Sequence, residues 1–66
     1  MSKVYKFVEL IGTSSDGYKA AIANGIEEAK KMHAGVRWFE VTEQRGYISE
    51  DGVAWYQAVL KIGYSD

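Results

Sequence analysis

Two side chains in the second half of the sequence, Trp38 and Gln57, could together bind a flat ligand. An indole can stack on a planar heterocycle, and a side-chain amide can pair with the polar edge of the same ring. Both residues lie in segments of nearly alternating apolar and polar residues, which predict β-strands with one buried face. If Phe39 packs in the core, Trp38 points to the other side of its strand. Spacing alone does not establish a ligand site.

The other polar residues are expected to have structural roles and not catalytic or ligand-binding ones. Segment 12–17 could hold a phosphate at a helix N-terminus, but it lacks Lys and Arg, so we interpret it as an ordinary helix cap. His33 has no acid–base partner near it in sequence and would complement the helix dipole. Glu27 and Glu28 are expected to face solvent. No nucleophile stands beside a base, and no two carboxylates form a catalytic pattern, so we predict no catalytic residue.

Length and composition limit the class of protein. A chain of 66 residues is expected to form a single domain, 1–66, and a core of that size rarely supplies more than about 3–5 kcal/mol. There is no Cys and one His, so no disulfide or metal site is predicted, and oligomerisation remains as a stabilising device. A net charge of −1 argues against a nucleic-acid partner. No signal peptide or membrane span is recognised, so we expect a cytoplasmic protein.

The sequence pattern predicts a scaffold in the order β-α-β-β. The expected elements are a strand at about 3–11, a helix at about 16–33, and strands at about 36–48 and 53–64. The turn at 49–52 makes the last two strands a hairpin. A right-handed crossover through the helix then gives a three-stranded antiparallel sheet in the order 1-3-2. The fold class is therefore α+β, with one helix on one face of the sheet and nothing on the other.

The predicted helix has an apolar face with small residues in it. Ser14 or Ser15 is expected to cap its first turn, and Gly35 to terminate it. The apolar face recurs at three- and four-residue steps and consists of Tyr18, Ala21, Ile22, Gly25, Ile26, Ala29 and Met32. Its alanines and glycine would let the helix lie close to the sheet.

Side chains alternate along a strand, so parity assigns each of them to one face of the sheet. The helix side is expected to receive Phe39, Val41, Tyr56, Ala58, Leu60 and Ile62. The uncovered side is expected to receive Trp38, Glu40, Thr42, Gln44, Trp55, Gln57, Val59 and Lys61. Apolar groups beside hydrogen-bonding groups on an uncovered face indicate a binding surface. A subunit interface would explain Trp55 equally well, because Trp is enriched there too.

Taken together, these segments resemble the dodecins, a family of small flavin-binding proteins. The resemblance covers 3–63 and rests on "KVYKFVELIGTSSDG", "AAIANGIEEAKK", "WFEVTEQRG" and "YQAVLKIG". It implies the β-α-β-β fold, a hollow homododecamer, and flavins (riboflavin, FMN or FAD) stacked in pairs between subunits. It also implies storage or sequestration of flavins without catalysis. The alternatives are a flavin-dependent oxidoreductase and a structural or nucleic-acid-binding βαββ module.

By position, the resemblance implies roles for three residues. Trp38 would stack on the flavin, Gln57 would contact the polar edge of its ring, and Arg45 would lie near the flavin pair. Parity from Phe39 places Arg45 on the helix side, so a twist or bulge is expected near Gly46. The chain departs from the family at its end, "GYSD", where members often carry a basic residue.

Overall fold

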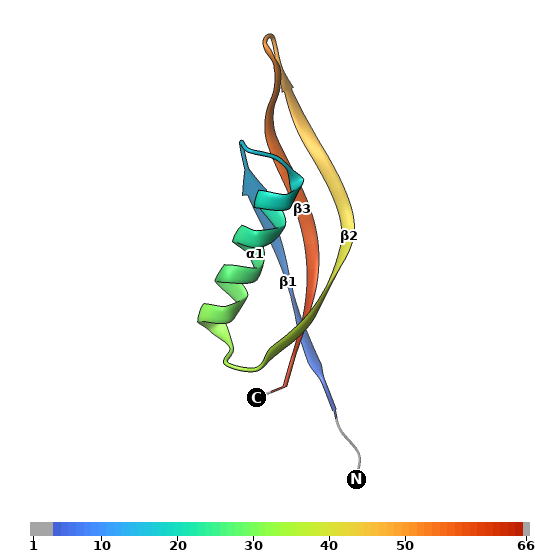
Figure 1. The fold of residues 1–66 in the computed structure, drawn as a ribbon. Coiled ribbons are helices and arrows are strands. Elements are labelled where there is room, and N and C mark those ends of the chain that lie inside the picture. Colours follow the sequence, from blue (N-terminus) through green and yellow to red (C-terminus); the bar gives the residue numbers. More distant parts are fainter. Residues whose placement is uncertain (1–3, 66) are drawn as a thin grey trace.

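Three antiparallel strands and one helix make up the chain in the computed structural model, which describes residues 4–65 (Figure 1). In chain order they are β1 (Lys6–Ser14), α1 (Tyr18–Met32), β2 (Val36–Ser49) and β3 (Gly52–Tyr64). β3 lies between the other two strands, which confirms the α+β fold and the order β1-β3-β2. The described residues contain no helix with the length and apolarity that crossing a bilayer requires.

The first strand ends later than predicted. Thr13 and Ser14, expected in a turn, pair with Gln57 and Tyr56 of β3 and so continue the sheet. The predicted start of the strand, Lys3, lies outside the described residues. The bend that leads into the helix therefore begins at Ser15, although the cluster of turn-forming residues begins at Gly12.

The start of α1 differs from the predicted serine cap. The residue before the helix is Gly17, which has a φ of 133° and offers no side-chain cap. A positive φ of this size favours glycine, since a Cβ would be strained there. Ser14 instead accepts a hydrogen bond on its Oγ from the backbone N–H of Asp16 at 3.0 Å. This serine therefore stabilises the turn that leads into the helix and does not cap the helix itself.

Small residues let α1 lie close to the sheet, as predicted. Ala21, Gly25 and Ala29 of the helix are buried. A Cβ on Gly12 of β1 would overlap the backbone carbonyl of Ala21, and a Cβ on Gly25 would overlap Leu60. The rest of the core consists of Ala58, Leu60 and Ile62 of β3. The partly buried side chains that pack against it are Val8, Leu10, Ile22, Ile26, Val36 and Val41.

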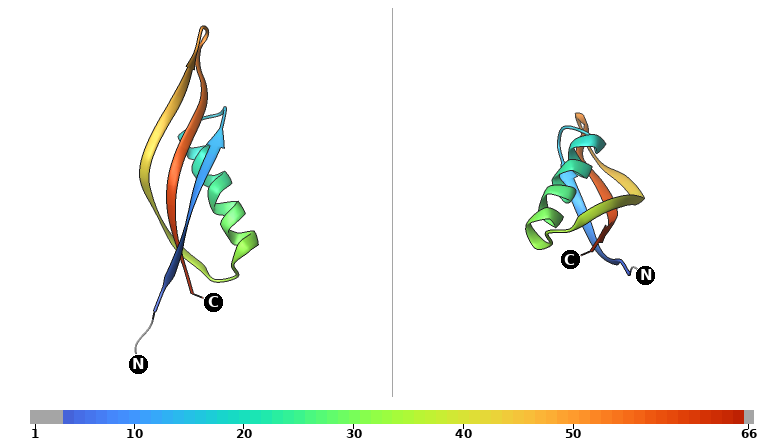
Figure 2. Two further views of the ribbon diagram at one scale, coloured as in Figure 1. Left: turned by 180° about the vertical axis from the view of Figure 1, so that it is seen from behind. Right: turned by 60° about the horizontal axis from the view of Figure 1, so that its bottom comes forward.

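α1 packs mainly on β1 and β3, and β2 curves away from it (Figures 1 and 2). Val41 of β2 still packs against the core. Phe39 pairs with Ile62 and so lies on the helix side of the sheet, as predicted. It nevertheless keeps 49% of its surface exposed, because the helix does not extend over this part of β2.

The sheet is longer than the helix that covers it. β2 and β3 continue past the N-terminal end of α1 as a two-stranded hairpin that ends in the predicted turn (Figure 1). Gly52 of this turn has a φ of 127°. The described residues extend over 55 × 19 × 13 Å, and their radius of gyration of 13.7 Å exceeds the roughly 11 Å typical of a compact chain of this length. Much of the sheet therefore has no covering within its own chain.

Candidate functional site

The face of the sheet opposite α1, which we call the open face, carries its side chains in rows across the strands. Residues directly opposite each other on paired strands share a face, so the pairing defines the rows. From the end near Tyr64 toward the hairpin turn they are Phe7–Gly63–Trp38, Glu9–Lys61–Glu40, Ile11–Val59–Glu43, Thr13–Gln57–Arg45 and Trp55–Tyr47. An aromatic row thus stands at each end, and the amide and guanidinium lie together in the fourth row.

An extra residue in β2 directs Trp38 to the open face. The pairing with β3 skips Arg37, so Val36 and Trp38 occupy adjacent positions of the ladder. Val36 packs against the core, and strict alternation would place Trp38 on the same side. The bulge instead leaves Trp38 opposite Gly63 and pointing away from α1, on the predicted face.

A second bulge, at Thr42, brings Arg45 to the open face. The pairing skips Thr42, whose Oγ1 donates a hydrogen bond of 3.2 Å to the carbonyl of Val59. Beyond the bulge, Arg45 pairs with Gln57 on the open face. The predicted irregularity is therefore present: the shift at Thr42 sets the face of Arg45, and a further register shift, between Tyr47 and Ile48, follows Gly46.

The same bulge overturns the predicted face of Gln44. This residue pairs with Ala58 and so lies on the helix side, while its neighbour Glu43 lies on the open face. Alternation counted along the sequence gives the opposite result, because it includes the unpaired residue.

The indole of Trp38 lies over Gly63 of β3. A Cβ on Gly63 would overlap three neighbouring ring atoms, Cε2, Nε1 and Cζ2, at nearly equal separations, so a face of the ring covers the glycine. The side chain keeps 40% of its surface exposed. In the next row, Lys61 directs its Nζ toward Phe7, 4.5 Å from the ring centroid. The indole is thus supported from one side and accessible from the other, as a stacking surface requires.

Arg45, Gln57 and Glu43 form a polar cluster on the same face. Arg45 Nη1 lies 3.5 Å from Gln57 Oε1, and Arg45 Nη2 donates a hydrogen bond of 2.6 Å to Glu43 Oε1. The carboxylate balances the charge of the guanidinium and orients it beside the amide. Sequence reasoning missed Glu43, although its spacing of two residues from Arg45 places both on one face of a strand.

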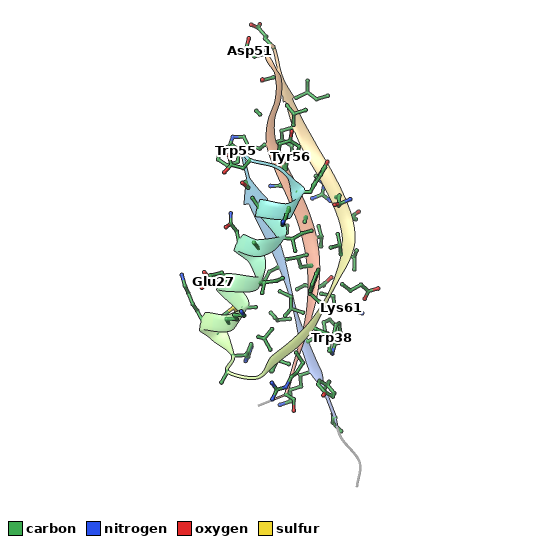
Figure 3. All side chains as sticks on the ribbon, viewed as in Figure 1. Glu27, Trp38, Asp51, Trp55, Tyr56 and Lys61 are labelled. Atoms are coloured by element: carbon green, nitrogen blue, oxygen red, sulfur yellow. The ribbon has the colours of Figure 1, made fainter. Side chains whose placement is uncertain are left out.

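Within one chain, the structure brings Arg45 to Gln57 but keeps Trp38 away from both. Along β3, Gly63 opposite Trp38 is six residues from Gln57, which is roughly 20 Å at 3.3–3.4 Å per residue. In Figure 3, Trp38 lies level with the C-terminal end of α1 and Trp55 level with its N-terminal end. A single flat ring cannot reach both groups, so a site that uses both needs two chains.

The open face also carries a hollow that is lined in part by residues of these rows, and one aromatic pair lies outside the rows. Glu9, Leu10, Ile11 and Val59 line an open hollow of about 460 Å³ on the β1 side of the sheet. His33, for which a role at the helix dipole was expected, stacks on Tyr64 with ring centroids 3.6 Å apart. Within residues 4–65, no three Asp, Glu or His side chains gather closely enough to hold a metal ion.

Comparison with known proteins agrees with this geometry. A family model described as Dodecin matches residues 4–65. The chain is 52% identical to the dodecin of Thermus thermophilus over 64 residues, which cover 97% of this chain and 93% of that protein. A crystal structure of a Thermus thermophilus protein matches with a TM-score of 0.91 and 51% identity, over 96% of this chain and 93% of that one. The W38F and R45A variants of the Thermus dodecin match with the same TM-score at 49% identity.

A more distant match is the calcium dodecin of Mycobacterium tuberculosis, described as having a novel calcium-binding site. It is 26% identical, with a TM-score of 0.83 over 97% of this chain and 91% of that one. The family model covers nearly the whole described chain, and the Thermus relative shares half of its residues. The chain therefore belongs to the dodecin family, whose members are flavin-binding proteins.

Proposed function

We propose that this chain stores or sequesters flavins as stacked pairs between the subunits of a homododecamer. The observation that carries the proposal is the indole of Trp38, which rests on Gly63 with one face and is accessible on the other. Indoles from two subunits would enclose a flavin pair between them. Gln57 and Arg45 of a neighbouring subunit would then meet the polar edges of the rings, since they lie too far from Trp38 within one chain.

The same arrangement accounts for storage without catalysis. A flavin enclosed between an indole and a second flavin has no ring face left for a hydride donor or acceptor, which turnover requires. We therefore assign no catalytic residue. The Thermus dodecin carries Trp and Arg at the same numbers as Trp38 and Arg45 here, and both were replaced in crystallised variants of that protein.

The proposed ligand is the flavin class: riboflavin, FMN or FAD. All three share the ring system that Trp38 and Gln57 would contact. Arg45 is already paired with Glu43, so the polar cluster is suited to the neutral ring edge more than to a terminal phosphate. A cytoplasmic location fits a flavin store and stays a prediction.

The absorption spectrum of the purified protein tests the proposal. We expect a flavin spectrum, and denaturation followed by chromatography should release and identify the flavin. Riboflavin added to protein stripped of ligand should lose its fluorescence, because electron transfer from a stacked indole quenches the excited ring. A protein that binds no flavin in either experiment would contradict the proposal. Oxidation of a nicotinamide cofactor faster than with free flavin would favour the oxidoreductase.

A further inference from the structure

We propose that Gly63 is a positioning residue for flavin binding, because the indole of Trp38 occupies the space that a side chain at position 63 would fill. This inference rests on the proposed function and adds a residue to the same site. Gly63 lies in the middle strand, opposite Phe7 of β1 and opposite Trp38 of β2. It is buried, although it belongs to the face that α1 does not cover.

The backbone does not explain why this position is a glycine. Among the described residues, the glycines with positive φ are Gly17 and Gly52, so Gly63 has a conformation that any residue adopts. It pairs in register with both neighbouring strands and stands next to no bulge of its own strand. What excludes a side chain is the indole, which occupies the volume where the Cβ would be.

A side chain at position 63 would displace the ring itself. The atoms that a Cβ overlaps, Cε2, Nε1 and Cζ2, belong to the rigid indole and not to the flexible end of a side chain. The ring must therefore change its χ angles and leave the sheet surface. An indole moved in this way no longer presents its face at the position where the flavin stacks.

Other glycines with too little space for a side chain have different neighbours. A Cβ on Gly12 or Gly25 would meet the helix or the core, and a Cβ on Gly35 would meet the backbone of Ser65. Substitutions there act on folding. Gly63 differs because its neighbour is the proposed stacking residue, so we expect its substitution to act on binding through Trp38.

A double-mutant cycle tests this coupling. Riboflavin fluorescence titrations would compare wild type, Gly63→Ala, Trp38→Ala and the double variant, each stripped of ligand. We expect Gly63→Ala to weaken binding at least about 5-fold in the wild-type background and less than about 2-fold in the Trp38→Ala background. Quenching of the riboflavin that still binds should also decrease, since the indole no longer stacks on the ring.

Gly46→Ala is the matched control. Gly46 is a strand glycine without positive φ, and its Cβ would make only ordinary contacts, the nearest 3.4 Å from Val53 Cγ1. It pairs with Tyr56 on the helix side, away from the open face. We expect its affinity to stay within about 2-fold of wild type, which corresponds to less than about 0.5 kcal/mol.

Several outcomes would overturn the inference. The inference fails if Gly63→Ala binds and quenches riboflavin as wild type does. It also fails if Gly63→Ala loses the same affinity with Trp38 and with Trp38→Ala, because the effect would then lie in folding or assembly. If Gly63→Ala does not assemble, Gly63→Ala combined with Trp38→Ala becomes the test, because that variant lacks the ring that would meet the methyl group. Failure of that variant to assemble would also overturn it. Wild type that binds no riboflavin, or Trp38→Ala that binds it equally well, would instead defeat the proposed function.

Discussion

At the scale of single residues, the proposed function depends most on Trp38. We expect Trp38→Ala to lose stacking energy of about 1–3 kcal/mol per ring, or roughly 5- to 150-fold in affinity. Trp38→Phe should keep part of the affinity, because a smaller ring still stacks. Both variants should assemble, since Trp38 lies outside the core beneath α1. Riboflavin titration checks the series. Equal affinity and equal quenching in wild type, Trp38→Phe and Trp38→Ala would show that Trp38 only packs in a subunit interface.

Gln57 should contribute less than Trp38. Gln57→Ala removes one or two hydrogen bonds of about 0.5–1.5 kcal/mol each, so a single lost bond weakens riboflavin binding by about 2- to 13-fold. It also removes the oxygen that lies 3.5 Å from Arg45 Nη1 and leaves the guanidinium to Glu43. Sedimentation should show the wild-type assembly. A variant that no longer assembles would show that Gln57 is a structural residue.

At the scale of elements, the close contact between α1 and the sheet predicts different costs for two similar substitutions. In Gly12→Ala the new methyl group meets the backbone of Ala21, which cannot move without shifting the helix. In Gly25→Ala it meets Cδ1 of Leu60, the end of a flexible side chain. Overpacking costs about 1–3 kcal/mol, and alanine recovers about 1 kcal/mol of helix propensity only at position 25.

Gly12→Ala should therefore lower the stability more than Gly25→Ala. Thermal unfolding at one fixed protomer concentration measures the difference, because the stability of an oligomer depends on concentration. Equal midpoints for the two variants, or a lower midpoint for Gly25→Ala, would contradict the packing described for this contact.

Much of this architecture could be predicted from the sequence. The apolar face of α1, the glycine of the hairpin turn and the strand order follow from periodicity and turn chemistry, which are local properties of the chain. Alternation counted from Phe39 predicts the face of Trp38 correctly, because the bulge at Arg37 does not lie between these two residues. Counting could not predict the face of Arg45, because the pairing with β3 skips Thr42 and this bulge depends on contacts with β3.

Two other features also depend on tertiary contacts. Ser14 has the residue type of a helix cap, but pairing with Tyr56 holds it in β1. The contact of Trp38 with Gly63 joins residues that are far apart in sequence, and it can be identified only when the strand register is known. The proposed use of Gln57 and Trp38 from different chains would be a property of the assembly, which no pattern within one chain encodes.

At the scale of the whole molecule, the chain exposes many large hydrophobic side chains. The hairpin beyond α1 carries the exposed side chains Tyr47, Ile48, Val53 and Trp55. An isolated two-stranded hairpin is at best marginally stable in water. Other subunits are therefore expected to cover this hairpin and the open face.

We accordingly expect a closed oligomer as the stable state. Sedimentation should show a single large species at micromolar concentration, and its melting temperature should rise with protein concentration. A well-folded monomer under these conditions would contradict the assembly. It would also contradict the flavin site, because one chain cannot bring Trp38 and Gln57 to the same ring.

The bulge at Thr42 has a consequence for how related sequences are aligned. Val41 pairs with Leu60 and Glu43 with Val59, so the residues on either side of Thr42 face consecutive residues of β3. Loss of the Thr42 codon would close the ladder without exchanging the faces of β2. What would change is the curvature of the strand, since a bulge bends and twists it. A gap at this position in an alignment thus marks a differently curved sheet, and so a different angle at which each subunit presents its indole and its polar cluster to its neighbours.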